Sequence, residues 1–474
     1  MSRVKILLLL CVAVGVAGFL IGFNGCGGVA SNNQPPPPPP PPPGKINHVV
    51  VIFQENRTTD NLFHDPVLIS RGADIASDAK NSSGQTIPLT PAPLVTTFDL
   101  AHSHAAFLAE WNNGAMDGAD KVPIFCPPGN PNCAPPNPWF QYVQASDVQP
   151  YFTLAETYTF GDRMFQTNQG PSFPAHQYII SGTSAITEKS NFNVSGNPTN
   201  TNRSSGCIAP PDGVVKIIDT TNFDPTSNET QTIYPCFEHP TLTDLLDAKS
   251  IDWKYYAPVE GSIWTGPNAI QHMCGPDLPP PNGTNCVGAE WKNHVVISKT
   301  QVLDDISHGQ LAAVSWVIPN QAASDHPRGT DGTGPSWVAS VVNAIGTSQY
   351  WKDTAIIITW DDWGGWYDHV PPPNIHNSYE YGLRVPLIVV SPYAKAKYIS
   401  HVNHDFGSIL KFIEITFGLP EIDPAVHYAD ARADDLSDCF DFHQTPLTFT
   451  PVAAPFNAQY FLNDKSPPEG PDDD

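Results

Sequence analysis

The chain has 474 residues, of which 40% are hydrophobic, so it can bury a large core in one big α/β domain or two ordinary ones, and it is not a disordered protein. Its formal net charge is -24, from 23 basic and 47 acidic residues. Such a charge disfavours contact with a phosphate backbone, and we expect no nucleic-acid partner.

The first 28 residues have the pattern of an export segment. A short basic stretch, Met1–Lys5, precedes the apolar run "ILLLLCVAVGVAGFLIGF", whose length suits either a signal peptide or a short membrane anchor. Cys26 stands where a lipoprotein would be cleaved and acylated, although Phe23 and Asn24 fit the usual pattern poorly. Cleavage, anchoring and lipidation all stay open. Each predicts a protein that is secreted, periplasmic or tethered to the cell surface.

Residues 29–44 form a proline-rich linker with nine consecutive prolines, Pro35–Pro43. A run of this kind makes a stiff polyproline spacer and no helix or sheet. We therefore expect a catalytic domain over residues 45–425, followed by a C-terminal extension and acidic tail over 426–474.

Apolar runs rich in β-branched residues alternate with runs of helical spacing, which predicts an α/β fold. The predicted strands are 48–53, 250–257, 311–318, 354–360 and 385–391, and the predicted helices are 151–165, 241–250, 335–346 and 405–418. Strands without polar interruptions are buried on both faces, as in a mostly parallel sheet covered by helices. The segments 66–98, 186–240 and 258–300 are rich in Pro, Gly, Asn, Ser and Thr, and we expect long loop insertions there that cover one end of the sheet.

Seven cysteines follow the export segment. The pairs whose spacing favours disulfides in an oxidising compartment are Cys126/Cys133, Cys274/Cys286 and, as a third candidate, Cys207/Cys236. Cys439 is left over. None of the seven has the CxxC spacing of a structural zinc site, which disfavours a metal held by thiolates.

Polar side chains follow two of the predicted strands. Glu55 and Asn56 come after strand 48–53, and Asp361 and Asp362 come after strand 354–360. Ligands of open α/β sheets bind beyond the carboxyl ends of the strands, and a cage of carboxylate and amide oxygens suits a hard or borderline divalent cation. The alternative is that these acids only cap the helices that follow them. Two such pairs at equivalent strand ends favour the metal site.

A nucleophile has two candidates. The chain has no G-x-S-x-G motif, which disfavours an acyl-transferring hydrolase. Ser172 in "NQGPSFPAHQYIISGTS" and Ser336 in "GTGPSWVASVVNAIG" each begin an apolar helix, where free N–H groups and the helix dipole would hold a phosphate. Either serine could instead be a plain N-cap. Histidines in loops add candidate anion or metal contacts, namely His102, His104, His326, His401 and His404.

Six ordered motifs resemble one known family. They are "ENRTTDNLF", "DLAHSHAAF", "GPSFPAHQYIISGTS", "SDHP", "TWDDWGGWYDHVPPP" and "GLRVPLIVVSPYAK". Together they resemble the phosphoesterase family of non-specific phospholipases C and secreted acid phosphatases, within the alkaline-phosphatase-like superfamily. The resemblance covers residues 46–420. It implies a three-layer α/β sandwich and a metal-dependent phosphoesterase that acts on phospholipids or small phosphate esters.

The resemblance also implies a role for each matching position. Glu55, Asn56, Asp361 and Asp362 match metal ligands, and Ser172 matches the nucleophile that would form a phosphoserine, which favours Ser172 over Ser336. His102 and His326 match histidines that contact the transferring phosphoryl group or its leaving group. His176 stands where the family often has an arginine, which puts the phosphate contact at that position in doubt.

Two other classes of function stay open. A sulfatase or phosphonate hydrolase could use the same scaffold, although the chain lacks the C-x-P-x-R stretch of sulfatases. A non-catalytic surface-binding protein could also share the fold, but such a protein has no need of a nucleophile. The identity of the metal stays open between calcium, magnesium, manganese, iron and zinc.

Overall fold

The computed structural model describes residues 44–201, 204–373 and 377–470. The predicted export segment and nearly all of the linker lie outside these ranges, so the expectations placed on them stay predictions. Among the described residues there is no helix both long and apolar enough to cross a membrane.

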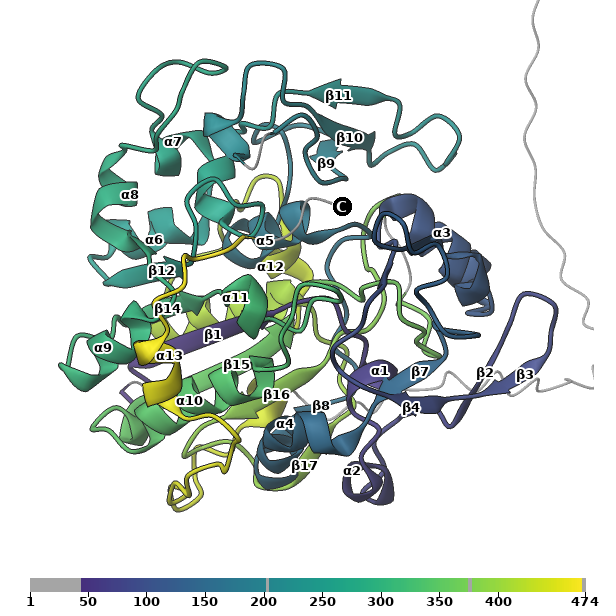
Figure 1. Cartoon of the computed structure of the whole chain (residues 1–474). Helices are drawn as coiled ribbons and strands as arrows, with labels where there is room; N and C mark the ends of the chain where they lie inside the picture. The colour runs from purple at the N-terminus through teal and green to yellow at the C-terminus, as the bar shows by residue number, and fades with distance from the viewer. Residues whose placement is uncertain (1–43, 202–203, 374–376, 471–474) are drawn as a thin grey trace, which may run out of the picture. The chain divides into compact units, whose positions relative to one another are not determined.

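An eight-stranded sheet forms the centre of the structure (Figure 1). Its strands in spatial order are β13 (Val295–Ile297), β12 (Trp253–Ala257), β14 (Val314–Val317), β1 (His48–Gln54), β15 (Thr354–Trp360), β16 (Leu387–Val390), β8 (Thr159–Gly161) and β17 (Tyr398–Ser400). All neighbours pair in parallel except at β16, which is antiparallel to both β15 and β8. The central strands β1 and β15 are buried along nearly their whole length, as continuous Val and Ile runs require.

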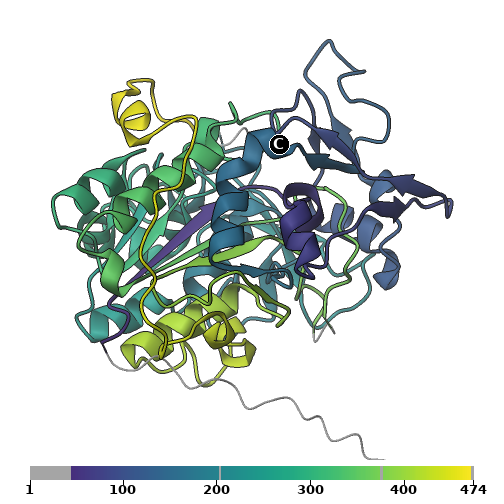
Figure 2. The ribbon, with the colours of Figure 1, turned by 90° about the horizontal axis from the view of Figure 1, so that it is seen from below.

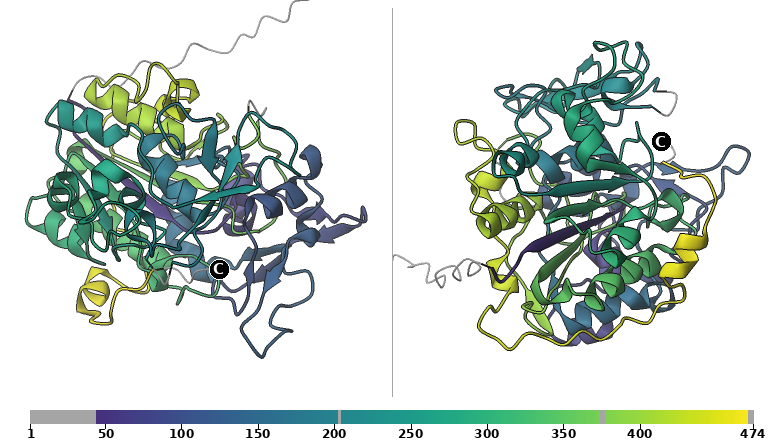
Figure 3. Two further views of the ribbon diagram at one scale, coloured as in Figure 1. Left: turned by 90° about the horizontal axis from the view of Figure 1, so that it is seen from above. Right: turned by 90° about the vertical axis from the view of Figure 1, so that its left-hand side faces the viewer.

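Helices cover both faces of this sheet (Figures 2 and 3). On one face α10 (Gly334–Gly346) packs against α4 (Ala145–Thr157), α9 (Gln301–Ser307) and α13 (Ala458–Asn463). On the other face α5 (Ser172–Ser181) packs against α6 (Leu242–Ala248) and α11 (Phe406–Phe417), and α11 in turn packs against α12 (Ala429–Arg432). The predicted α/β fold with a mostly parallel sheet between helices is confirmed.

The segments outside the central sheet and its covering helices carry short elements of their own. Their small sheets join β2 (Asp78–Lys80) to β3 (Thr86–Pro88), β4 (Thr90–Ala92) to β7 (Gln141–Val143), β5 (Asp99–Leu100) to β6 (Ile124–Phe125), and β9 (Phe192–Val194) and β11 (Gln231–Ile233) to β10 (Val215–Asp219). The remaining α-helices are α1 (Thr59–Leu62), α2 (Pro66–Ser70), α3 (His104–Trp111), α7 (Gln271–Cys274) and α8 (Ala289–His294). Short 3-10 turns span Asn112–Gly114, Ala119–Lys121, Gly206–Ile208, Gly266–Ala269, Gln321–Ala323, Trp351–Asp353 and Ser437–Cys439.

The helix predicted over residues 151–165 is wrong at both ends. The helix begins at Ala145 and runs through Pro150, and it ends at Thr157. Residues 159–161 form β8 inside the sheet, where Gly161 lets Leu387 approach: a Cβ on Gly161 would lie 2.8 Å from Leu387 Cδ2. Pairing with β16 and β17 thus overrides the local helical spacing.

The three predicted disulfides are confirmed, as Cys126–Cys133, Cys207–Cys236 and Cys274–Cys286. Cys439 is free and buried. Cys207–Cys236 and Cys274–Cys286 lie in the predicted insertions 186–240 and 258–300, and Cys126–Cys133 closes the loop between β6 and β7. In such loops with few apolar residues, a disulfide supplies a covalent constraint in place of a core.

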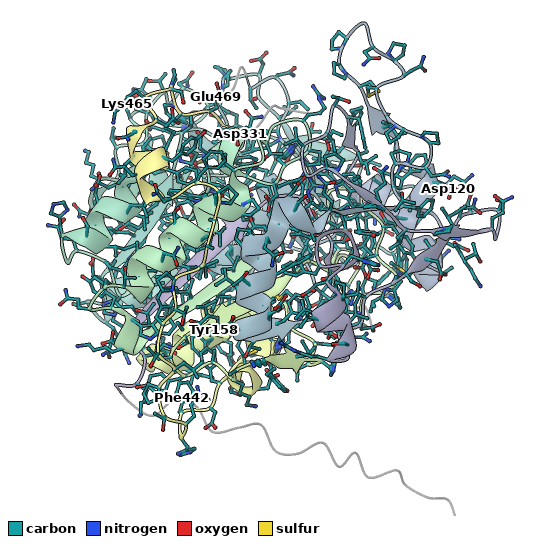
Figure 4. All side chains as sticks on the ribbon, turned by 60° about the horizontal axis from the view of Figure 1, so that its bottom comes forward. Asp120, Tyr158, Asp331, Phe442, Lys465 and Glu469 are labelled. Carbon is teal, nitrogen blue, oxygen red and sulfur yellow. A yellow bond between two sulfur atoms is a disulfide. The ribbon has the colours of Figure 1, made fainter. Side chains whose placement is uncertain are left out.

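The C-terminal segment returns along the outside of the fold. Phe442, Val452 and Phe461 join the main hydrophobic core. The last described residues then lie along the loop after β14, because Glu469 N donates to Asn320 Oδ1 (2.7 Å); Figure 4 labels Lys465, Glu469 and Asp331 in this region.

Candidate active site

Four polar side chains follow the ends of two paired strands and lie close together. β1 and β15 run in parallel with Gln54 opposite Trp360, so the residues that follow each strand emerge side by side. Glu55, Asn56, Asp361 and Asp362 are all fully buried. Asn56 N donates to Asp361 Oδ1 (3.0 Å), which joins the two strand ends directly. The structure therefore brings together the four residues predicted as metal ligands.

The backbone at this junction is tightly shaped. Asn56 has φ 61, a left-handed conformation that asparagine tolerates better than most residues. Gly364, with φ +64, packs directly on it: a Cβ on Gly364 would lie 2.3 Å from the Asn56 carbonyl oxygen. Gly364 N also donates to Asp362 Oδ1 (2.7 Å). The sharp turn at Gly364 thus orients Asp362 and fixes the position of Asn56.

Ser172 lies against this cluster as the first residue of α5. Its Oγ is 3.4 Å from Asp362 Oδ2 and 3.5 Å from Glu55 Oε2. The preceding Gly170 is packed so closely that a Cβ there would lie 2.1 Å from the Tyr379 hydroxyl. The N-terminal end of α5 therefore presents a hydroxyl, with the positive end of the helix dipole behind it, to the buried carboxylates of Glu55 and Asp362.

Ser336, the competing candidate, lies elsewhere. It is in the first turn of α10, and its Oγ accepts a hydrogen bond from Phe456 N (3.4 Å) of the C-terminal segment. Its contacts are those of a packing residue.

His176 is a member of the cluster that the sequence did not identify as a ligand candidate. It lies one turn after Ser172 on α5, is fully buried, and places Nε2 3.1 Å from Glu55 Oε1. The Tyr255 hydroxyl donates to the Trp264 carbonyl (2.9 Å) and lies 3.3 Å from His176 Nδ1. The Tyr255 oxygen can therefore accept a hydrogen bond from the Nδ1–H group of His176. That tautomer turns the Nε2 lone pair toward Glu55. The i, i+4 spacing from Ser172 was the available signal.

Burial and mutual repulsion raise the pKa values of the acidic side chains Glu55 and Asp362. Burial raises the pKa of Glu55 well above its usual range, and the charges of Asp361 and Asp362 raise it further. Burial and the charge of Asp361 likewise raise the pKa of Asp362. Burial lowers the pKa of His176 to about 4, so its imidazole is neutral near pH 7. Three carboxylates and a neutral imidazole make a site that lacks positive charge.

The donor set fits a divalent cation. Glu55, His176 and Asp361 each offer an atom within 4.8 Å of the others. Two further atoms, Asp361 Oδ2 and Asn56 Oδ1, are buried without a hydrogen-bond partner. Buried polar atoms in native proteins are nearly always satisfied, and carboxylate, amide and imidazole groups are ordinary ligands of borderline metals. These orphaned oxygens are the observation that a bound cation would explain.

The two predicted histidines stand at the edge of the cluster. His102 Nε2 lies 3.3 Å from Asn56 Nδ2, while its Nδ1 lies 2.9 Å from the Leu100 carbonyl. This arrangement holds the Asn56 amide with its oxygen away from His102. The ring of His326 packs edge-on against that of His102, with centroids 5.9 Å apart.

A buried ion-pair network supports the turn after β15. Arg384 donates from Nε to Asp368 Oδ1 (2.8 Å) and from one terminal nitrogen to Asp60 Oδ1 (3.1 Å). His369 bridges Asp60 and Asp74, with its two ring nitrogens 2.7 and 2.9 Å from their carboxylates. Arg384 thus supplies the charge that balances these acids, and the network holds the turn in place. Of the other loop histidine motifs, His404-Asp405 precedes α11, and Asp405 caps that helix.

A cavity of about 310 Å³ opens next to Ser172. His102 and Pro171 line it, Phe125 and Val214 give it apolar walls, and Lys216 adds a positive charge. Its volume falls in the range of small-molecule sites. The walls come from the β9–β10–β11 insertion and from the loops beside it.

Fold and site together define an α/β enzyme whose nucleophile candidate and charged groups gather at the carboxyl ends of a mostly parallel sheet. The model of the Phosphoesterase family matches residues 46–420, most of the chain, and the chain belongs to that family. The resemblance inferred from the six motifs is confirmed, and the protein is a hydrolase of phosphoric esters.

Curated relatives are phospholipases C. Phospholipase C B of Mycobacterium tuberculosis is 25% identical over 455 residues, covering 85% of this chain and 78% of the relative. Hemolytic phospholipase C of Pseudomonas aeruginosa is 25% identical over 456 residues, covering 84% of this chain and 56% of the relative. A solved structure of a protein in the alkaline phosphatase superfamily from Vibrio parahaemolyticus has a TM-score of 0.35 at 10% identity, covering 84% of this chain and 71% of that one.

Proposed function

We propose that this protein is a metal-dependent phosphoesterase of the phospholipase C or acid phosphatase type, with Ser172 as its nucleophile. The observation that carries the proposal is the position of Ser172 Oγ, 3.4 Å from Asp362 Oδ2 and 3.5 Å from Glu55 Oε2 at the start of α5. A serine so placed, beside orphaned ligand atoms, is arranged for phosphoryl transfer.

Five side chains would hold the cation, namely Glu55, Asn56, Asp361, Asp362 and His176. When bound, a divalent cation neutralises charge on the phosphate and lowers the pKa of a neighbouring hydroxyl. His176 extends the set predicted from the sequence, and its low pKa keeps the imidazole available as a ligand.

Ser172 would carry the covalent step. Its Oγ loses a proton toward the carboxylate oxygens beside it and attacks phosphorus, while the bond between phosphorus and the leaving oxygen breaks. The N-terminal end of α5 favours the negative charge of the phosphoryl group. Water then attacks the phosphoserine and releases phosphate or a phosphorylated headgroup, restoring the hydroxyl.

The histidines would act around this step. His102 orients the Asn56 amide through its contact at 3.3 Å, and so acts as a positioning residue. His326, packed against His102, would contact the phosphoryl oxygens or protonate the leaving alcohol.

The substrate we favour is a phospholipid or another ester with an apolar leaving group. The cavity bordered by His102 and Pro171 has apolar walls at Phe125 and Val214, which suits the glycerol and first acyl carbons of a lipid. Two relatives named as phospholipases C support the same class. Small phosphomonoesters remain the second candidate class, since nothing in the cluster around Ser172 requires a diester.

We also propose that the protein acts outside the cytosol, either secreted or tethered to the cell surface. Three disulfides favour an oxidising compartment, and the N-terminal pattern is that of an export segment.

The decisive experiment compares Ser172→Ala with Ser336→Ala, a matched serine in the first turn of a different helix. Hydrolysis of p-nitrophenyl phosphate, p-nitrophenylphosphorylcholine and phosphatidylcholine is measured with and without chelator. We expect Ser172→Ala to lower kcat by roughly 10³-fold or more while Ser336→Ala retains activity. Full activity in Ser172→Ala refutes the nucleophile, and full activity in chelator refutes the metal.

The same assay separates the alternatives. A surface-binding protein would turn over none of the three substrates. A sulfatase would hydrolyse p-nitrophenyl sulfate in preference to the phosphate esters. A preference for phosphatidylcholine over p-nitrophenyl phosphate supports the phospholipase class, and the reverse supports the phosphatase class.

A further inference from the structure

A second cluster of ligand-type side chains lies where the C-terminal segment meets the end of β17. His404 lies between β17 and α11, and Asp438 and Cys439 lie in the 3-10 turn Ser437–Cys439. His404 and Cys439 are buried, and the Asp438 side chain is 13% exposed. None of the three belongs to the elements that carry the active-site residues. The cluster therefore lies just beneath the surface, with a short path to solvent past Asp438.

The three donor atoms face one another at ligand-like separations. His404 Nε2 is 3.4 Å from Asp438 Oδ1, Asp438 Oδ1 is 3.5 Å from Cys439 Sγ, and Cys439 Sγ is 4.0 Å from His404 Nε2. Tetrahedral zinc bonds to nitrogen, oxygen and sulfur place such atoms roughly 3.4–3.6 Å apart. Two edges of the triangle already have these lengths, and the third needs to contract by only about 0.5 Å.

The surroundings complete the pattern of a metal-binding histidine. The other ring nitrogen of His404, Nδ1, lies 2.8 Å from Asp434 Oδ1. Metal-ligating histidines commonly place their second nitrogen against a carboxylate in this way, which fixes the tautomer and directs the free lone pair at the ion. Ser400 Oγ lies 3.1 Å from His404 Nε2 and 2.5 Å from Asp438 Oδ2, so a further oxygen borders the same space.

The thiol has no other evident use. The other cysteines of the described chain are all paired in disulfides. Cys439 is free and buried, so its sulfur is available as a ligand.

We propose that His404, Asp438 and Cys439 bind a zinc-class divalent cation at a structural site separate from the active site. Its mixed nitrogen, oxygen and sulfur donors suit zinc better than calcium or magnesium. Because only one ligand is a cysteine and His404 lies 34 residues before Asp438, the CxxC test applied to the sequence misses this site.

A cation at this site would link the turn 437–439 to the end of β17 and stabilise the segment that contains Phe165. The main chain of His404 also accepts a hydrogen bond from Phe165 N (2.8 Å), in the segment that leads from β8 to Ser172. Bound cation would therefore stabilise the packing of the C-terminal segment and the base of the loop that leads into α5.

Cobalt(II) titration of the full-length protein, with Cys439 kept reduced, tests the proposal. A thiolate ligand produces a thiolate-to-cobalt charge-transfer absorption, and the active-site donors include no sulfur. We expect this absorption in the wild type, its loss in Cys439→Ser, and its displacement by zinc. A wild type without the absorption, or an absorption that persists unchanged in Cys439→Ser, overturns the proposal.

Two aspartates in the same turn region provide a matched pair of variants. Asp434→Asn weakens the support of His404, and we expect metal affinity to fall roughly 10–100-fold, measured by competition with a chelator. Asp435→Asn removes a similar charge at a residue that only caps Ser437 N, and we expect affinity close to wild type. Equal affinities in the two variants contradict the assigned role of Asp434. The wild-type spectrum needs no variant, and a wild type without the thiolate-to-cobalt absorption overturns the proposal even where a variant fails to fold.

Discussion

Gly364 offers the sharpest test of the active-site geometry. In Gly364→Ala the new Cβ would lie 2.3 Å from the Asn56 carbonyl oxygen and 2.8 Å from Asn56 Cβ. Because ordinary contact begins near 3.4 Å, Asn56 or the turn must move by about 1 Å. The positive φ adds a conformational cost of roughly 1–2 kcal/mol. A shift of this size at a catalytic centre lowers the rate on the order of 10²-fold.

Gly84→Ala is the matched control. Gly84 also has a positive φ, +77, but nothing lies within 4 Å of its added Cβ. Both variants therefore share the conformational cost, measured by urea unfolding, and only Gly364→Ala displaces Asn56. The assay is kcat for p-nitrophenyl phosphate at saturating metal. A Gly364→Ala enzyme with wild-type kcat, or one that loses no more activity than Gly84→Ala, would refute the reasoning.

Three further predictions concern the scaffold. Ile357→Ala empties a fully buried position in β15 and should cost about 2–5 kcal/mol in urea unfolding; a loss well below that range means that the sheet collapses around the cavity. Replacing Cys207 and Cys236 by serine removes a disulfide between residues 29 apart in sequence and should lower the free energy of unfolding by about 2–4 kcal/mol. The free energy of unfolding of the reduced wild type provides the comparison. Burial alone would lower the pKa of His369, but its hydrogen bond to Asp60 and the neighbouring acidic charges outweigh burial and raise the pKa to about 9. Since the pKa is raised on folding from about 6.5, this stabilisation is complete below about pH 6.5 and is lost as pH rises through 9. His369→Gln should flatten that part of the stability profile, and identical slopes in both proteins would contradict the assignment.

Strand ends were predictable from the sequence because the sheet is parallel and buried. Strand 354–360 was predicted at the bounds that the structure shows, and the polar residues behind it and behind β1 stood out against long apolar runs. The sequence alone thus associates Asp361 with Glu55. What fixes their closeness is the register of β1 against β15, which apolar patterns alone do not specify.

Other parts of the site depend on contacts between distant segments. The choice of Ser172 over Ser336 needed the family resemblance, since both begin apolar helices after "GPS". The sequence does not predict His176 as a ligand because its role depends on its contact with Glu55, 121 residues away in sequence. β8 was hidden because three residues of strand carry too short a pattern to outweigh the helix before them.

The placement of the cavity walls has an evolutionary consequence. Four of the proposed metal ligands, Glu55, Asn56, Asp361 and Asp362, follow the ends of two central strands, where a single inserted residue in β1 or β15 would turn every side chain to the opposite face. The cavity beside them is walled partly by β10 and the loops around it, which lie outside that sheet. Mutations there can change the specificity for the leaving group while the catalytic residues stay the same. Chemistry and selectivity are therefore free to diversify on separate parts of one gene product.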